Sequence, residues 1–230
     1  MRLDKFLCKS TDLTKEKATI AINKGEVSVN GMVCLDESKQ VHENNTVTLN
    51  GLTLITRPFR YIVMNKPAGT ICSNIDEVYP SLFNYVDVDN VSELHIAGRL
   101  DADTTGLVLI TDDGHWSFNI TVPTKQCHKV YRVGLTRPIA DDVAEKFKHG
   151  IKLQGEKHLT RPATLEIVGP KEVLLTITEG KFHQVKRMFA AVGNRVISLH
   201  REQIGQVELD VESGRWRYLS NEEVASFIQK

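Results

Sequence analysis

The chain has 230 residues, of which 41% are apolar and 25% are charged. This composition is typical of soluble globular proteins with one or two domains. Its 29 Lys and Arg residues balance 29 Asp and Glu residues, so bulk positive charge alone would not hold it on nucleic acid. The charges are segregated, because residues 180–201 carry five Lys or Arg and no acid, whereas residues 67–98 carry five acids and neither Lys nor Arg. The pattern permits a basic surface, although two solvated surfaces without a partner would look the same.

The four cysteines stand far apart and form no Cys-x-x-Cys pair. Their spacing argues against a zinc site or a disulfide framework and fits a reducing cytosol. The first residues are charged, and no stretch approaches the roughly 20 apolar residues of a membrane span. We therefore expect a cytoplasmic protein without a membrane partner.

The first part of the chain predicts a small module of two helices and a short sheet. Helices are expected over residues 3–9 and 15–23, the second one capped by Thr14. Asn30-Gly31 is a strong hairpin signal. Strands are expected over residues 27–29, 32–35 and 46–49. A linker over residues 53–60, broken by Pro58, sets the predicted domains at residues 1–57 and 58–230.

The second part alternates strands and helices without an internal repeat, which predicts an α+β domain. The expected strands cover residues 61–64, 94–97, 106–111, 128–136, 164–168, 173–178 and 196–199. Pro138 opens an expected helix over residues 138–148, and a second helix is expected over residues 182–192. Ser220 and Glu223 form a capping box for a last helix.

A charged loop precedes the apolar strand at residues 106–111 and carries Arg99, Asp101 and Asp103. A carboxylate at the mouth of a buried strand is a common position for an active site. Taken alone, these side chains would serve equally well to cap and turn the backbone.

The motif Gly98-Arg99-Leu100-Asp101, with the strand that follows it, closely resembles the signature loop of pseudouridine synthases. Three further motifs resemble segments of the same enzymes in the same order: Asn65-Lys66-Pro67-Ala68-Gly69, Lys129-Val130-Tyr131 and residues 179–188. The sequences of residues 103–108 and 183–194 most closely resemble those of the RsuA-type, ribosomal small-subunit branch of the family.

The N-terminal residues 2–7 and 25–31 resemble an S4-type RNA-binding domain. The resemblance as a whole implies an S4-like domain, followed by a catalytic domain with a mixed, mostly antiparallel sheet and a site in its central cleft. It also implies site-specific isomerisation of a uridine in 16S rRNA to pseudouridine, at uridine 516 in the customary numbering, without a cofactor or a metal.

The resemblance implies three catalytic residues. Asp101 is the catalytic carboxylate, Tyr131 stacks on the uracil and assists proton removal, and Lys186 is the basic partner of Asp101. Whether Asp101 attacks covalently or acts through a glycal intermediate stays open. The chemistry requires that water be excluded, so that the detached uracil is retained.

A helical wheel of residues 182–192 tests the place of Lys186. Phe182, Val185 and Met188 share one apolar face, Lys186 falls at its edge and Arg187 falls nearly opposite. Lys186 can therefore reach inward and favour the ionised form of Asp101 in a dry cleft. An ordinary lysine at the edge of an apolar face would look the same.

Several basic residues are expected to bind RNA. Arg99 would contact a phosphate or help to flip the uridine out of the stack, and Arg187 would meet solvent or phosphate. The N-terminal module would add phosphate contacts through Lys5, Lys9, Lys15, Lys17 and Lys24. The expected partner is 16S rRNA or a small-subunit assembly intermediate, bound by a monomer. These lysines would equally suit the solvated faces of two short helices.

Two other functions remain open at this stage. An RNA-binding ribosome assembly factor with an idle enzyme site would bind rRNA without forming pseudouridine. A nucleoside glycosidase would perform half of the isomerisation and release free uracil.

Overall fold

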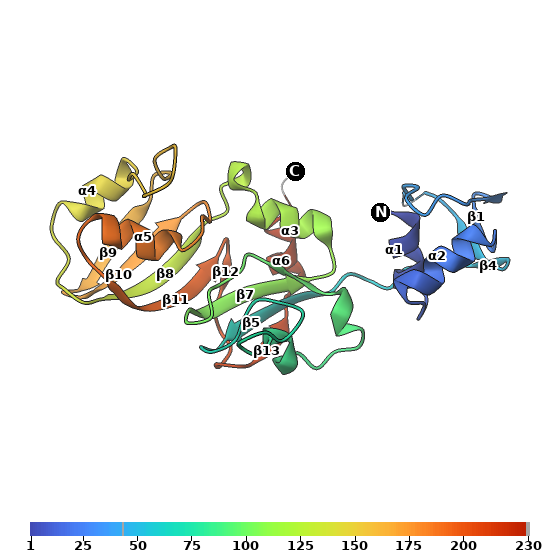
Figure 1. Cartoon of the computed structure of the whole chain (residues 1–230), viewed down its shortest axis with the longest axis horizontal. Helices are drawn as coiled ribbons and strands as arrows, with labels where there is room; N and C mark the ends of the chain where they lie inside the picture. Colours follow the sequence, from blue (N-terminus) through green and yellow to red (C-terminus); the bar gives the residue numbers. More distant parts are fainter. Residues whose placement is uncertain (43, 229–230) are drawn as a thin grey trace. The chain divides into compact units, whose positions relative to one another are not determined.

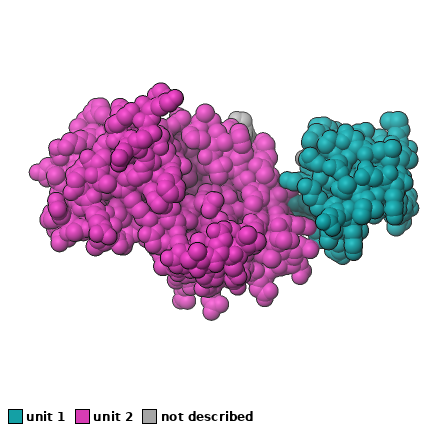
Figure 2. Space-filling model, in the orientation of Figure 1, with its two compact units in different colours: residues 1–58 teal, residues 59–230 magenta. Residues whose placement is uncertain are grey.

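The computed structural model describes residues 1–42 and 44–228. The chain divides into two compact units, Met1–Pro58 and Phe59–Lys230, which Figure 2 colours separately. Each unit has its own hydrophobic core. In the described part of the chain, no helix is long and apolar enough to cross a membrane.

Unit 1 contains two helices and a four-stranded sheet in its described residues. The helices are α1 (Leu3–Ser10) and α2 (Lys15–Asn23), and the sheet has the order β2 (Met32–Val33), β1 (Val27–Val29), β3 (Val47–Leu49) and β4 (Leu52–Thr53). The expected cap of α2 is confirmed, since the Thr14 side chain accepts a hydrogen bond from the Lys17 backbone. The expected linker begins too early, because its first residue, Thr53, still pairs with Thr48 of β3.

Unit 2 is built on a mixed sheet of nine strands among the described residues, in the order β13-β5-β7-β11-β8-β10-β9, with β6 beside β7 and β12 beside β11. The strands are β5 (Tyr61–Lys66), β6 (His95–Ala97), β7 (Thr105–Thr111), β8 (Lys129–Leu135), β9 (Thr164–Gly169), β10 (Glu172–Ile177), β11 (Val196–Ile204), β12 (Val207–Glu208) and β13 (Trp216–Tyr218). Strands β7 and β11 are parallel, and the other described pairs are antiparallel.

Helices cover two ends of this sheet (Figure 1). They are α3 (Gly114–Thr121), α4 (Val143–Lys148), α5 (Gln184–Ala191) and α6 (Asn221–Ala225), and short 3₁₀ turns occupy Leu82–Tyr85, Val91–Glu93 and Pro123–Lys125. Helices α4 and α5 meet through the rings of Phe147 and Phe189, whose centroids lie 5.2 Å apart. Helices α3 and α6 meet where the Trp116 indole donates to the Val224 carbonyl. The expected capping box of the last helix is confirmed.

Several expected elements have other bounds in the structure, and three of them have a clear physical reason. The helix expected over residues 138–148 begins only at Val143, because the Ile139 backbone N–H donates to the Pro170 carbonyl of the β9–β10 turn. The helix expected from Phe182 begins at Gln184, since His183 has a left-handed backbone with φ 48°. The strand expected over residues 196–199 continues as β11 to Ile204, where it pairs with β8.

Candidate active site

The loop between β6 and β7 is held by a buried lysine at the end of β5. The Lys66 side chain is fully buried. Its ammonium donates to the carbonyl oxygens of Thr104 at 2.8 Å, Pro67 at 3.0 Å and Ala102 at 3.3 Å. Burial lowers the pKa of Lys66 below its ordinary value. Two of the three carbonyls belong to the loop that carries Asp101, so this ammonium fixes the backbone on the C-terminal side of the carboxylate.

A buried arginine holds the N-terminal side of the same loop. Arg201 of β11 is 1% exposed, and its guanidinium donates to the Gly98 and Leu107 carbonyls at 2.7 Å each. The backbone of Arg201 also approaches Gly106, where an added Cβ would lie 2.3 Å from the Arg201 carbonyl oxygen. Gly106 has φ +105°, so this crossing of β7 and β11 requires glycine.

The loop places Asp101 against helix α5. The Lys186 ammonium lies 3.0 Å from Asp101 Oδ2 and 2.7 Å from Asp103 Oδ1. The structure therefore contains the expected ion pair, and it adds a second carboxylate that shares the same ammonium. Because α5 packs its Val185 and Met188 side chains into the core, the base of Lys186 is fixed while its tip reaches the loop.

Lys186 and Asp103 shift each other's pKa. Burial lowers the pKa of Lys186, but hydrogen bonds to Asp103 and Asp101 outweigh this effect and leave the pKa raised above its ordinary value. The hydrogen bond from Lys186 in turn lowers the pKa of Asp103. At neutral pH the cluster thus contains a firmly protonated ammonium.

The expectation of a dry cleft around Asp101 is wrong for the free protein. The Asp101 side chain is 31% exposed and the Asp103 side chain is 73% exposed. Within the loop only Leu100 and Thr104 have buried side chains, so the two carboxylates stay at the surface.

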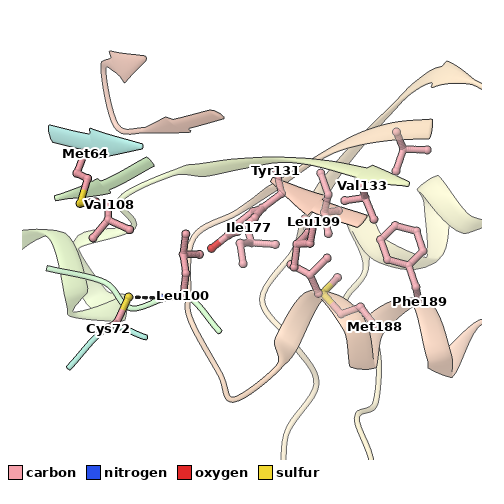
Figure 3. Close-up of a cluster of buried hydrophobic side chains, with 14 of the residues drawn as sticks. Met64, Cys72, Leu100, Val108, Tyr131, Val133, Ile177, Met188, Phe189 and Leu199 are labelled. Carbon is pink, nitrogen blue, oxygen red and sulfur yellow. Dashed lines mark hydrogen bonds between the residues drawn. The ribbon is translucent and has the colours of Figure 1, made fainter. Parts of the chain in front are cut away.

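Tyr131 comes to this region from β8, which lies on the other side of β11 from β7. It is 7% exposed, and its hydroxyl accepts a hydrogen bond from Arg201 at 3.2 Å. Figure 3 shows the hydroxyl end of its ring directed toward Leu100, the residue before Asp101, and both residues belong to one buried cluster. The backbone of Leu100 also donates to the Cys72 thiol at 3.2 Å, which gives the loop a further attachment to the core.

Sequence reasoning missed Arg201 as a site residue. Strand pairing explains its position, because Arg201 lies opposite Tyr131 on one side and opposite Gly106 on the other. Its contacts are 70 to 103 residues away in the chain. No local signal marked it, because Arg201 stands between His200 and Glu202 and lies beyond the strand expected over residues 196–199.

Two residues near Asp101 behave differently from expectation. His183, to which no chemistry was assigned, places its Nε2 atom 3.5 Å from Asp101 Oδ1. Arg187 does not point freely to solvent, because it pairs with Glu156 at 3.3 Å and donates to the carbonyls of Phe182 and Gln154. Its side chain thus holds the turn before α5.

The remaining basic residues divide by exposure. Arg99 is exposed, as are the lysines of unit 1 at positions 5, 15, 17 and 24. Lys9, in the last turn of α1, is the exception at 7% exposure. A buried ammonium is a poor phosphate contact, so the expected role of Lys9 is not supported. Among the described residues, no three His, Cys, Asp or Glu side chains gather as a metal site.

Comparison with known proteins agrees with this architecture. The family model for RNA pseudouridylate synthase matches residues 60–191, and the S4 domain model matches residues 1–47. A solved structure described as a pseudouridylate synthase superposes with a TM-score of 0.73 at 44% identity, covering 99% of this chain and 100% of that one.

Curated relatives match over the full length of the chain. The ribosomal small subunit pseudouridine synthase A of Vibrio cholerae is 51% identical over 228 residues, which cover 98% of this chain and 99% of the relative. The protein of the same name from Escherichia coli K12 is 46% identical over 231 residues, which cover 99% of this chain and 100% of the relative. With a family model over more than half of its residues and relatives of this identity, the chain belongs to the RNA pseudouridylate synthase family and carries an N-terminal S4 domain.

Proposed function

We propose that this enzyme converts one uridine of 16S rRNA, uridine 516 in the customary numbering, to pseudouridine, with Asp101 as the catalytic carboxylate. The observation that carries the assignment of Asp101 is its ion pair with Lys186 in a loop fixed on both sides by Lys66 and Arg201. The choice of the small-subunit RNA is supported by relatives that carry this name at 46–51% identity over their whole length.

The reaction exchanges one glycosidic bond for another. The N1–C1′ bond of uridine breaks, the uracil turns, and C5 bonds to C1′; the proton of C5 leaves and N1 takes up a proton. Atoms and electrons balance without any other reactant. A carboxylate beside C1′ stabilises or traps the sugar once the base has left, and the Lys186 ammonium orients that carboxylate. Both a covalent and a glycal intermediate fit this arrangement.

Tyr131 supplies the second part of the chemistry. Its hydroxyl accepts from Arg201, and a guanidinium only donates, so the phenol hydrogen must point away from Arg201. A tyrosine fixed in this way stacks on the uracil and assists removal of the C5 proton. The flipped uridine and its RNA cover the partly exposed Asp101 side chain and exclude water from it.

The exposed cations supply phosphate contacts. In unit 2, Arg99 stands next to the carboxylate loop and is available to the flipped nucleotide. In unit 1, the exposed Lys5, Lys15, Lys17 and Lys24 bind the RNA backbone and hold the substrate near the catalytic unit.

Tritium release tests the role of Asp101. With 16S rRNA tritiated at uridine C5, we expect Asp101→Asn to slow release by at least about a thousandfold, because loss of such a group removes several powers of ten from a rate. Asp103→Asn is the matched control, since Asp103 binds the same ammonium from an exposed position, and it should change the rate less than about tenfold. Release that survives Asp101→Asn would remove Asp101 from this role.

Pseudouridine mapping tests the substrate. In rRNA from a strain that lacks this protein, the modification at uridine 516 should be missing and should return with the wild-type gene. Stoichiometric rRNA binding without any missing pseudouridine would favour an assembly factor instead.

A further inference from the structure

An exposed aromatic pair lies beside the carboxylate cluster and is not used by the chemistry above. Phe182 is 76% exposed. Its ring stacks on the imidazole of His183, with centroids 3.7 Å apart and an angle of 22° between the planes. One face of Phe182 is therefore backed by a second ring, and the remaining surface is open to solvent.

Hydrogen bonds to buried side chains and to Arg187 fix the turn that carries this pair. Gln184 accepts from the Lys181 backbone at 2.8 Å and donates to Glu179 at 2.9 Å. Gln184 and Glu179 are both buried, and Arg187 donates to the Phe182 carbonyl at 3.0 Å. The aromatic pair is thus presented on an anchored turn, so that a ligand would lose little entropy in ordering it.

The backbone of this turn departs from a relaxed conformation. His183 has φ 48°, a left-handed conformation that is uncommon for residues other than glycine. Such conformations persist where the surroundings over-determine them, and they cluster at functional sites. Here the consequence is geometric, because the turn sets the two rings in a stack and brings the imidazole next to Asp101.

The position of the pair selects one kind of ligand. His183 Nε2 lies 3.5 Å from Asp101 Oδ1, so a nucleotide that reacts at Asp101 has its RNA neighbours next to this turn. A flat, backed aromatic ring is the platform on which proteins stack unpaired bases of single-stranded nucleic acid. The cations on either side, Lys181 and Arg187, are engaged with Glu156, which leaves the exposed ring rather than an ammonium as the available contact.

We propose that Phe182, backed by His183, stacks on the nucleobase adjacent in the RNA to the uridine that reacts at Asp101. The inference rests on the proposed function and names a binding subsite within it. The stack holds the flanking base after the uridine has left the helix. Loss of the aromatic ring should weaken RNA binding about 5- to 150-fold, the range for removal of one base stack.

The test uses full-length protein and fragments of 16S rRNA that carry 2-aminopurine in place of one of the two bases flanking the target uridine. Stacking on Phe182 quenches the probe at one of these positions. We expect Phe182→Tyr to retain the quenching and Phe182→Leu to lose it. Phe118→Leu is the matched control, because Phe118 is an exposed phenylalanine of α3 at 54% exposure, and it should retain the quenching.

Kinetics on unlabelled RNA separates this subsite from the chemistry. Phe182→Leu should raise KM about 5- to 150-fold and change kcat less than about threefold. Wild-type quenching and wild-type KM in Phe182→Leu would overturn the platform while leaving the proposed function intact. An equal loss of quenching in Phe118→Leu would also overturn the proposed stacking on Phe182. If the wild-type protein forms no pseudouridine in any rRNA fragment or precursor, the proposed function itself fails.

Discussion

Single side chains with several partners hold the candidate site together. Lys66 donates to three carbonyls and Arg201 to two carbonyls and a phenol. Both are buried charges, and each would be costly without such partners. The protein therefore uses two buried cations as fixed points for a polar loop, and the ammonium of Lys186 then meets a carboxylate whose backbone is already in place.

Arg201 offers a test at the level of one hydrogen bond. Arg201→Met should lower kcat for pseudouridine formation about 10- to 100-fold, since a charge-assisted hydrogen bond contributes about 1.5–3 kcal/mol. In a Tyr131→Phe background the same substitution should lower kcat by a smaller factor, because the phenol that Arg201 orients is already absent and only the contacts with the loop are lost. Single-turnover rates of the four proteins, measured below their melting temperatures, give the comparison.

Two controls separate the effect of Arg201 on Tyr131 from its effect on the loop at Gly98. Arg201→Lys keeps a cation that reaches fewer acceptors, and it should recover part of the rate. Equal losses in the two backgrounds would show that Arg201 acts through the loop at Gly98 and not through Tyr131.

At the scale of elements, pairing of strands distant in sequence builds the site. Strand β11 lies between β7 and β8, so it joins the loop of Asp101 to the strand of Tyr131. His200 of β11 lies opposite Thr105 of β7, and its Nδ1 atom is 2.7 Å from the Thr105 hydroxyl. Burial lowers the pKa of His200 below its ordinary value of 6.5.

This shift predicts a pH dependence of stability. The folded state holds His200 neutral at a pH where the unfolded chain binds a proton, so folding becomes less favourable as protons are added. The contribution is present in full above 6.5 and is lost as the pH falls through the folded pKa. Denaturant unfolding on both sides of this pH should show a smaller loss of unfolding free energy for His200→Gln than for wild type. His128→Gln, at an exposed histidine, should behave as wild type. If the unfolding free energy of His200→Gln depends on pH as strongly as that of the wild type, the prediction is wrong.

The sequence predicted elements with strong local signals and failed where distant contacts decide. The caps at Thr14 and Ser220 were predicted correctly because each involves residues within one helical turn. Helix α3 was missed, since no helix was expected between the strands at residues 106–111 and 128–136. Asp113 in fact caps the helix by accepting from the His115 and Trp116 backbones.

The candidate site was predictable to the extent that motifs contain it. Asp101, Tyr131 and Lys186 were named from residue patterns, and the structure brings Lys186 to Asp101. The shared role of Asp103 and the place of Arg201 depend on which strands meet. No local window contains that information.

At the scale of the whole molecule, the two units have separate hydrophobic clusters, so their stabilities can be changed separately. Unit 1 buries Leu3, Leu7 and Ile22 in its own cluster. A domain of about 60 residues gains only about 3–5 kcal/mol from a single small core. Unit 2 contains both tryptophans, Trp116 and Trp216, so tryptophan fluorescence reports on unit 2, whereas far-ultraviolet circular dichroism reports on both units.

Leu7→Ala should therefore act on unit 1. Loss of a fully buried leucine costs about 2–5 kcal/mol, which approaches the whole stability of such a unit. The circular dichroism transition should begin at lower denaturant, while the midpoint of tryptophan fluorescence stays at its wild-type value. Ile20→Ala is the matched control on α2, where Ile20 is 52% exposed, and it should shift neither signal appreciably. A fluorescence midpoint that falls with Leu7→Ala would contradict independent unfolding.

The single ammonium between Asp101 and Asp103 has a consequence for anyone who wishes to redesign this enzyme. The Asp103 side chain is 73% exposed, yet it shares the Lys186 ammonium with Asp101. Replacement of Asp103 by a neutral, longer or basic residue would change how strongly Lys186 interacts with Asp101. The loop therefore contains a tuning position for reactivity that can be altered without repacking the protein.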